Sequence, residues 1–416
     1  MCAPSRMLLA LGLLPVFTAA GQEALRSADS IDAVLDAQAV ANAAPQPHAL
    51  NLGPVALNIG SYLGVTWDDN INAVPDHTRS DTSIHSGLNL GFLWPATENS
   101  KIRLDSQFGY VTYLGHTRSD SIEIAPNSAL SWGLTFPDSS LSFYDQFVYS
   151  DEVITVPSIA GLNSLPRLEN TVGTRAQWLP EHWQFEAGLS HADFISPDKK
   201  YSYLDRGSEY LSLRGAWRFA ENTQAGLELS LGQTAYRQKI QSDNTSYSLG
   251  PYANWNLTQF LTVNLSGGPT IYRFAASPGR PASTLTSYYF DLELTHQITD
   301  FVAHSLSLRR DVNLGYNRGN DYTELLSCIY AIHWDTTQFS QLGLTLTYEL
   351  GDQPLTESLV STKENFHRIG LGASASYHLT DKLMGSVDFS HWVRSSSFSR
   401  NNYSENSVSL QFAYHF

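Results

Sequence analysis

The sequence has few charged residues and few cysteines for its length. Of its 416 residues, 16% are charged, against roughly 25% in soluble domains. Cys2 precedes an apolar stretch, so once that stretch is removed Cys328 is the one cysteine left and no internal disulfide can form. The low charge argues against the surface of an ordinary soluble protein.

Long apolar runs are also scarce. After the first twenty residues, no uninterrupted apolar run reaches the length of about 20 residues that a membrane-spanning helix needs. The first twenty residues themselves are typical of a secretory signal peptide: Arg6 is followed by an apolar core over residues 7–17 and by Thr18-Ala19-Ala20. We therefore expect residues 1–20 to be removed on export.

Motifs for catalysis, metal binding and nucleic-acid binding are missing. The net charge is -15 and no basic patch appears, which argues against a nucleic-acid partner. The thirteen histidines stand singly, outside any metal-binding pattern. Ser190 and His191 are neighbours, so in a strand they point to opposite faces and cannot act as a catalytic pair. We expect no enzyme activity, no metal and no cofactor.

Alternation of apolar and polar residues is what the sequence does have. In the segment 342–350 the even positions hold Leu or Tyr and the odd positions hold Gly, Thr or Glu; segment 183–189 alternates in the same way. Such a period of two indicates strands with one apolar and one polar face. The pattern continues from Leu52 to Phe416.

The connections between these segments alternate between short and long, as in bacterial transmembrane barrels. We expect short periplasmic turns at Pro95–Ser100, Pro137–Ser140, Pro180–Glu181, Ala220–Asn222, Thr258–Gln259, Thr299–Asp300, Thr336–Thr337 and Thr380–Asp381. We expect extracellular loops at Asp68–Asp81, Gly115–Asp120, Asp151–Leu165, Pro197–Asp205, Gln238–Ser242, Ala275–Ser283, Asn317–Asn320, Gly351–Lys363 and Ser395–Asn402. The sequence thus predicts an all-β fold: one antiparallel up-and-down transmembrane β-barrel over residues 52–416, with about 18 strands (16–18).

Aromatic residues flank the short turns, where the inner-leaflet girdle of a barrel belongs. They are Trp94, Phe136, Trp178, Trp183, Phe219, Phe260, Phe301, Trp334 and Phe339. The last strand places Phe412, Tyr414 and the terminal Phe416 on one apolar face. This ending is similar to the assembly signal of outer-membrane barrels, so the expected partners are outer-membrane lipid and the barrel-assembly machinery. Residues 21–51 are expected to form a short helix and a linker, placed either in the periplasm or in the barrel mouth.

Thirteen charged residues fall on the predicted inner face: Arg103, Asp105, Arg175, Glu186, Arg214, Arg218, Glu228, Asp291, Glu293, Arg309, Asp311, Asp388 and Arg394. Either they line a pore that filters solutes by charge and size, or they pair with one another and fill the lumen. A barrel of this size leaves an aqueous channel, which favours the pore. The apolar loop Asp151–Leu165 either folds into the lumen and narrows it, or covers a neighbouring loop or a subunit interface.

Three features fit the pattern poorly. Arg310 falls in the lipid-facing phase of its segment, and Pro251 interrupts another segment. The segment Tyr322–Trp334 is apolar on both faces, so it is expected to contact either the N-terminal segment or another subunit of a homo-oligomer.

Residues Gly64-Val65-Thr66-Trp67-Asp68-Asp69-Asn70-Ile71 resemble the strand-plus-loop opening of the β-barrel porin 2 family. The resemblance implies an outer-membrane location in a Gram-negative bacterium and a pore-like role, and some relatives are associated with exopolysaccharide systems. The expected function is a porin-like channel for passive diffusion of small hydrophilic solutes. The alternatives are the outer-membrane component of a polysaccharide export or secretion system and, third, an outer-membrane enzyme. Asp68, Asp69 and Asn70 either cap a turn or contribute to a calcium site.

Overall fold

A computed structural model describes residues 50–115, 118, 120–152, 156–162, 164–220, 223–357 and 360–416. The predicted signal peptide and nearly all of the segment 21–51 lie outside these residues. The described residues contain no helix that is long and apolar enough to cross a membrane.

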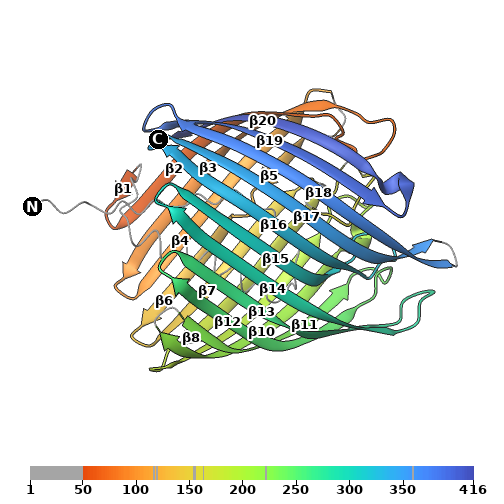
Figure 1. The fold of residues 1–416 in the computed structure, drawn as a ribbon, viewed down its shortest axis with the longest axis horizontal. Helices are drawn as coiled ribbons and strands as arrows, with labels where there is room; N and C mark the ends of the chain where they lie inside the picture. The colour runs from red at the N-terminus through yellow and green to blue at the C-terminus, as the bar shows by residue number, and fades with distance from the viewer. Residues whose placement is uncertain are drawn as a thin grey trace, which may run out of the picture.

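The described chain is built almost wholly of strands, joined by turns, loops and two short 3-10 turns, η1 (Ser202–Leu204) and η2 (Ser399–Asn401) (Figure 1). The strands are β1 (Leu50–Leu52), β2 (Val55–Asp68), β3 (Asp81–Thr97), β4 (Ser100–Tyr113), β5 (Ser121–Ile124), β6 (Ala129–Phe136), β7 (Ser139–Ser150), β8 (Arg167–Trp178), β9 (Trp183–Ile195), β10 (Arg206–Ala220), β11 (Thr223–Tyr236), β12 (Asn244–Thr258), β13 (Leu261–Phe274), β14 (Ser283–Thr299), β15 (Val302–Leu314), β16 (Tyr322–Thr337), β17 (Ser340–Glu357), β18 (Val360–His378), β19 (Leu383–Ser396) and β20 (Tyr403–His415).

These strands close into a single antiparallel barrel. From β2 onward each strand pairs with the next, and β2 pairs with β20 from Gly60 opposite His415 to Asp68 opposite Ser407. Strands β5 and β6 share one position in the wall, because both pair with β4 and with β7. The short β1 pairs only with the start of β2. The wall therefore has 18 strands, as the sequence predicts.

The strands β2 and β20 close the barrel together. The Phe416 amide donates a hydrogen bond to the Ile59 carbonyl at 3.0 Å, so the last residue still extends the β2–β20 ladder. Below that point, β1 pairs with Val55–Leu57 and continues the wall along β2. The edge of β2 is thus paired at Val55–Leu57 and again from Ile59 onward, which leaves little of it as a template for aggregation.

The predicted turns and loops agree with the strand ends except at one loop. Each of the eight predicted short connections lies within two residues of a strand-to-strand junction, and eight of the nine predicted loops fall between strands. The prediction of a loop at Gly351–Lys363 is wrong. There β17 continues to Glu357 and β18 begins at Val360, with Pro354 opposite Lys363, and this hairpin extends beyond the neighbouring strands (Figure 1). Outside the membrane a ladder needs no apolar face, so the alternation that guided the prediction stops before the strands do.

The outer surface carries the apolar side chains. All nine aromatics of the predicted girdle are exposed, from Trp94 at 40% to Phe219 at 67%. On the last strand, Val408, Leu410 and Phe412 are exposed in the same way. In water such a continuous apolar belt would be strongly unfavourable, whereas hydrocarbon favours it. The outside of the barrel is therefore built to face lipid.

The inner wall is packed by aromatic rings that lie over glycines. A Cβ on Gly87 would come within 2.2 Å of the Phe108 carbonyl oxygen and 2.6 Å of the Tyr62 ring, and one on Gly109 within 2.2 Å of the Tyr62 hydroxyl. Gly351 makes the same space for Phe366. The glycines thus let these rings pack flat against the inner wall.

Arg310 lies where two strands separate. Pairing of β14 with β15 ends at Phe290 opposite Arg310, above which β14 pairs with β13 alone and β15 with β16 alone. The guanidinium stacks on the Tyr288 ring at 3.9 Å and pairs with Glu324 at 2.8 Å. The outward charge is thus neutralised at an opening of the ladder.

The other two exceptions have local explanations. At Pro251 the pairing of β12 with β13 lapses between Ser248 and Tyr252 and resumes in the same register, because proline has no amide hydrogen to donate. In β16 the inward Leu325 packs against Phe366. This inward apolar residue of β16 therefore packs within the barrel, without the N-terminal segment or another subunit.

Candidate pore and its constriction

The thirteen predicted charges lie on strands whose opposite face carries the exposed apolar belt. The register places Arg214 directly opposite both Glu186 and Glu228. Most of the set forms ion pairs: Arg103 with Asp105, Arg175 with Glu186 at 2.8 Å, Arg214 with Glu228 at 3.1 Å, Arg309 with Asp291 at 2.7 Å, and Arg394 with Glu364 at 3.0 Å. The mixed-sign lining is therefore largely a set of neutral pairs.

The remaining charges of the set have weaker partners. Arg218 donates a hydrogen bond to the Glu181 carbonyl. Glu293 accepts one from the Asn264 amide at 3.3 Å, and Asp388 accepts one from the Ser386 hydroxyl at 3.4 Å. Asp311 accepts a hydrogen bond from the Val312 amide at 2.9 Å and is buried. Among the described residues, neither Glu293 nor Asp388 has an arginine or lysine partner.

The loop between β7 and β8 enters the barrel and reaches its opposite wall. The Ser158 carbonyl accepts hydrogen bonds from the Gln353 amide of β17 at 3.1 Å and the Asn317 amide at 3.3 Å. The Pro157 carbonyl accepts one from Arg394 of β19 at 3.3 Å. Counting from β2, β8 is the sixth and β17 the fifteenth of 18 strands, half a circuit away. The loop therefore spans the lumen, as the first predicted placement has it, and it also covers the neighbouring β9–β10 loop, as the second one has it.

The loop ends on a fully buried polar network on the far wall, which we call the latch: Asn320, Thr323, Gln353, Glu364 and Arg394. Each is at most 1% exposed. The Gln353 side chain accepts hydrogen bonds from Asn320 and Thr323 and donates one to Glu364 at 2.7 Å. The network satisfies its own charges and holds the loop carbonyls. Arg394, predicted to line the pore, is thus shielded from solvent beneath the loop.

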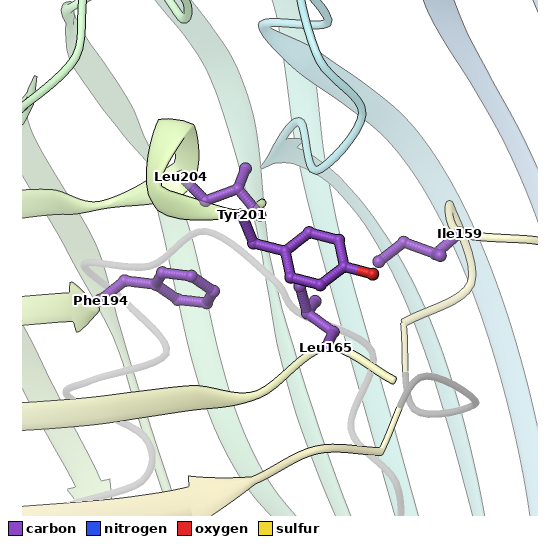
Figure 2. Packing of buried hydrophobic residues seen from close by; sticks show 5 residues of the cluster. All are labelled: Ile159, Leu165, Phe194, Tyr201 and Leu204. Carbon is purple, nitrogen blue, oxygen red and sulfur yellow. The ribbon is translucent and has the colours of Figure 1, made fainter. Parts of the chain in front are cut away.

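The near side of the loop rests on the largest apolar cluster of the described residues. Ile159 and Leu165 of the loop pack with Phe194 of β9 and with Tyr201 and Leu204 of the β9–β10 loop. Figure 2 shows the five side chains converging from these segments inside the barrel. Tyr316 from the β15–β16 loop joins the cluster and accepts a hydrogen bond on its carbonyl from Tyr203 at 2.8 Å. Apolar packing thus fixes one end of the loop and hydrogen bonds fix the other.

The root of the loop carries two carboxyls in a crowded acidic environment. Burial raises the pKa of Asp151 and Glu152 above the ordinary range; Glu123 raises both further, and Arg118 opposes the shift. His85 lies 3.7 Å from Glu123 and also opposes the shift at Glu152. The Arg167 guanidinium donates a hydrogen bond to the Glu152 carbonyl at 2.6 Å. The loop root is therefore sensitive to protonation.

Several residues of this site are missing from the sequence-predicted set. Arg368 pairs with Glu349 at 2.5 Å, and both side chains are at most 3% exposed. Both lie in phase with the inner faces of β17 and β18. Extending the alternation into the supposed loop at 351–363 would have found Gln353, and following it from residue 364 onward would have found Glu364 and Arg368. The four residues of the latch other than Arg394 were missed because polar residues at these positions resemble loop residues.

Asp68, Asp69 and Asn70 form the turn that the sequence allowed. The Asn70 amide donates a hydrogen bond to the Asp68 carboxylate at 2.7 Å, and Asp69 accepts two hydrogen bonds from Asn406 of β20. These bonds continue the β2–β20 closure beyond the ladder. In the described residues no group of three or more His, Cys, Asp or Glu is arranged to hold a metal ion.

No family model matches the chain, and no curated protein matches it in sequence. Solved structures do match. The outer membrane protein OpdK from Pseudomonas aeruginosa superimposes with a TM-score of 0.50 at 13% identity, over 86% of this chain and 99% of that one. OpdQ from the same organism gives 0.49 at 11% identity, over 88% and 100%. The fold is that of an outer-membrane porin. At these identities the likeness shows the fold alone.

Proposed function

We propose that the protein spans the bacterial outer membrane as a channel for the passive diffusion of small hydrophilic solutes. The observation that carries the proposal is the closed 18-strand wall with an apolar outside and a polar inside. Barrels of 16 to 18 strands leave an aqueous lumen because side chains are too short to fill it. The crossing loop then acts as the constriction that sets the size limit.

The sequence-predicted inner charges take a narrower role in this proposal. Arg103, Asp105, Asp291, Glu293, Arg309 and Asp388 would contact the aqueous path, since the ion pairs among them keep 20% or more of each side chain accessible. Arg394 holds the loop instead. Membership of the β-barrel porin 2 family remains part of this proposal and is supported by the Gly64–Ile71 motif. Asp69 of that motif joins β2 to β20 through its two hydrogen bonds from Asn406.

Purified protein in a planar lipid bilayer tests the channel. We expect stable conductance steps that persist without any partner. A variant in which residues 156–162 are replaced by a short Gly-Ser linker should conduct more, because the loop no longer crosses the lumen. Absence of steps in both proteins over many insertions would refute the proposal, provided that unboiled samples still run as folded barrels on a denaturing gel.

The alternative of an export component predicts a different outcome. The crossing loop supports the export alternative only if it closes the aqueous path through the lumen completely. In that case the intact protein shows no conductance, while the loop-replaced variant conducts. Comparing these two proteins therefore separates an open diffusion channel from a closed one that needs a partner to open it.

A further inference from the structure

We infer that the channel selects cations over anions, by means of a ring of carboxylates in the periplasmic half of the lumen. This inference rests on the proposed channel function and adds the class of solute that passes. It starts from which inward charges are neutralised within the wall and which remain available to a passing ion.

Inward arginines are mostly neutralised within the wall. Seven of them pair with carboxylates, namely Arg103, Arg167, Arg175, Arg214, Arg309, Arg368 and Arg394. An eighth, Arg206, is buried among the rings of Phe194, Tyr236 and Tyr316. A paired or enclosed guanidinium contributes little field to the lumen, because the partner charge lies within one hydrogen bond.

Inward carboxylates outnumber these arginines. Glu293 and Asp388 accept hydrogen bonds only from neutral groups among the described residues, and the Glu293 side chain is exposed. Asp105 pairs with Arg103 but keeps 41% of its side chain accessible, twice the fraction of its partner. The charges that a solute meets in this part of the lumen are therefore predominantly negative.

These three carboxylates lie at one level of the barrel. Asp105 is five residues from the periplasmic end of β4 at Ser100, Asp388 is five from that of β19 at Leu383, and Glu293 is six from that of β14 at Thr299. Since all strands of a barrel share one tilt, equal distances along the strands mean equal heights. The three strands are spread around the wall, so the carboxylates form a ring and not a patch.

Other charges near this level do not cancel the ring. Arg214 and Arg309 lie at similar heights, but each is paired, with Glu228 and Asp291 respectively. Lys101 and Arg218 lie closer to the periplasmic rim, where Asp335 and several turn carboxylates accompany them. A ring of like charge in a narrow path with low-dielectric walls focuses its field and concentrates counter-ions.

The test is the reversal potential of single channels in a tenfold KCl gradient. We expect the wild type to pass K⁺ over Cl⁻ by roughly threefold or more. The double variant Glu293→Gln with Asp388→Asn should bring that ratio close to one while still conducting. Both changes keep the shape of the side chain and its hydrogen-bonding ability, so the barrel should fold, which heat-modifiable migration on a gel checks.

A matched control removes two negative charges from the periplasmic turns next to the same two strands. Asp300 follows β14 and Asp381 precedes β19, both in the periplasmic turns. Asp300→Asn with Asp381→Asn should leave the selectivity near the wild-type value. Conductance with no cation preference in the wild type, or an equal loss in both double variants, overturns the carboxylate ring and leaves the channel itself standing. Absence of conductance in the wild type and the loop-replaced variant overturns both.

Discussion

Two charged pairs beneath the crossing loop are buried, whereas the Arg103–Asp105 pair near the periplasmic end of β4 is in contact with solvent. The Arg394–Glu364 pair of the latch has no accessible side-chain surface, and the Arg368–Glu349 pair has almost none. In the lower half, Arg103 and Asp105 keep 20% and 41% of their surfaces accessible.

The difference between these pairs follows from what covers each of them. The β7–β8 loop lies across the upper half and excludes water from the wall behind it, so its charges can persist only as fully bonded pairs. In the lower half burial is uneven: Glu228 is 1% accessible, whereas the Arg103–Asp105 and Arg309–Asp291 pairs keep at least 20% of each side chain accessible. The same residue types therefore hold the loop in place where they are covered and are open to mobile ions where they are accessible, as at Arg103 and Asp105.

The largest effect is expected from Arg394→Ala. The change leaves the Glu364 carboxylate buried without its partner, which costs about 3–5 kcal/mol, and removes a donor to the Pro157 carbonyl. Urea unfolding in detergent micelles, followed by gel migration, measures the loss. The double variant Arg394→Met with Glu364→Leu should recover most of it, because no charge is then left unpaired. A cost below about 1 kcal/mol for Arg394→Ala would mean that water reaches the latch.

Gln353→Leu should have the next largest effect. The amide joins Asn320, Thr323, Glu364 and the loop carbonyl of Ser158, and its loss leaves several buried groups unsatisfied at about 1–3 kcal/mol. Because the loop is then held less firmly, we also expect noisier single-channel currents. Gln224→Leu, at the periplasmic end of β11, is the matched control and should change neither quantity. Quiet currents in Gln353→Leu would show that the apolar cluster alone holds the loop.

The barrel and its lipid-facing surface could be predicted from sequence because apolar and polar residues alternate within each strand. This pattern can be recognised in one strand without knowledge of the others. The girdle aromatics and the terminal Phe416 each depend on local position alone. The turn at Asp68–Asn70 also follows from local residue chemistry. None of these features requires knowing which distant strands face each other across the lumen.

The latch could not be predicted in this way. Gln353 meets Ser158 across 195 positions of sequence and half a circuit of the barrel, and nothing in the local pattern of either segment marks the contact. Polar residues at 351–363 look like a loop because the apolar alternation ends there. Likewise, Arg103 and Arg394 look equivalent by phase, and only the path of the crossing loop distinguishes a solvent-accessible charge from a buried one.

Lowering the pH should stabilise the docking of the β7–β8 loop in the extracellular half of the barrel. The docked loop raises the pKa of Asp151 and Glu152, chiefly by burial, so docking favours the protonated carboxyls. The docked loop is most stable below the ordinary carboxyl pKa near 4. Its stability falls as the pH rises through the raised pKa of Asp151 and Glu152. We expect single-channel conductance to increase from pH 4 to pH 8. Glu123 and Asp151 face Glu152 as like charges, with Arg118 and His85 as opposing ones. Glu152→Gln should flatten the profile, and an unchanged profile would remove Glu152 as the sensor.

The smallest effect on stability is expected from Arg103→Ala, in the lower half. Its pair with Asp105 is screened by water in the lumen, so the loss should stay within about 0–1 kcal/mol, several-fold less than for Arg394→Ala. The same change exposes an uncompensated carboxylate at the level of Glu293 and Asp388. Cation selectivity should therefore rise while stability barely moves, and urea unfolding together with the reversal potential measures both. If Arg103→Ala instead destabilised the barrel as much as Arg394→Ala, the lower pair would hold the wall as the upper one does, and the contrast between the two halves would fail.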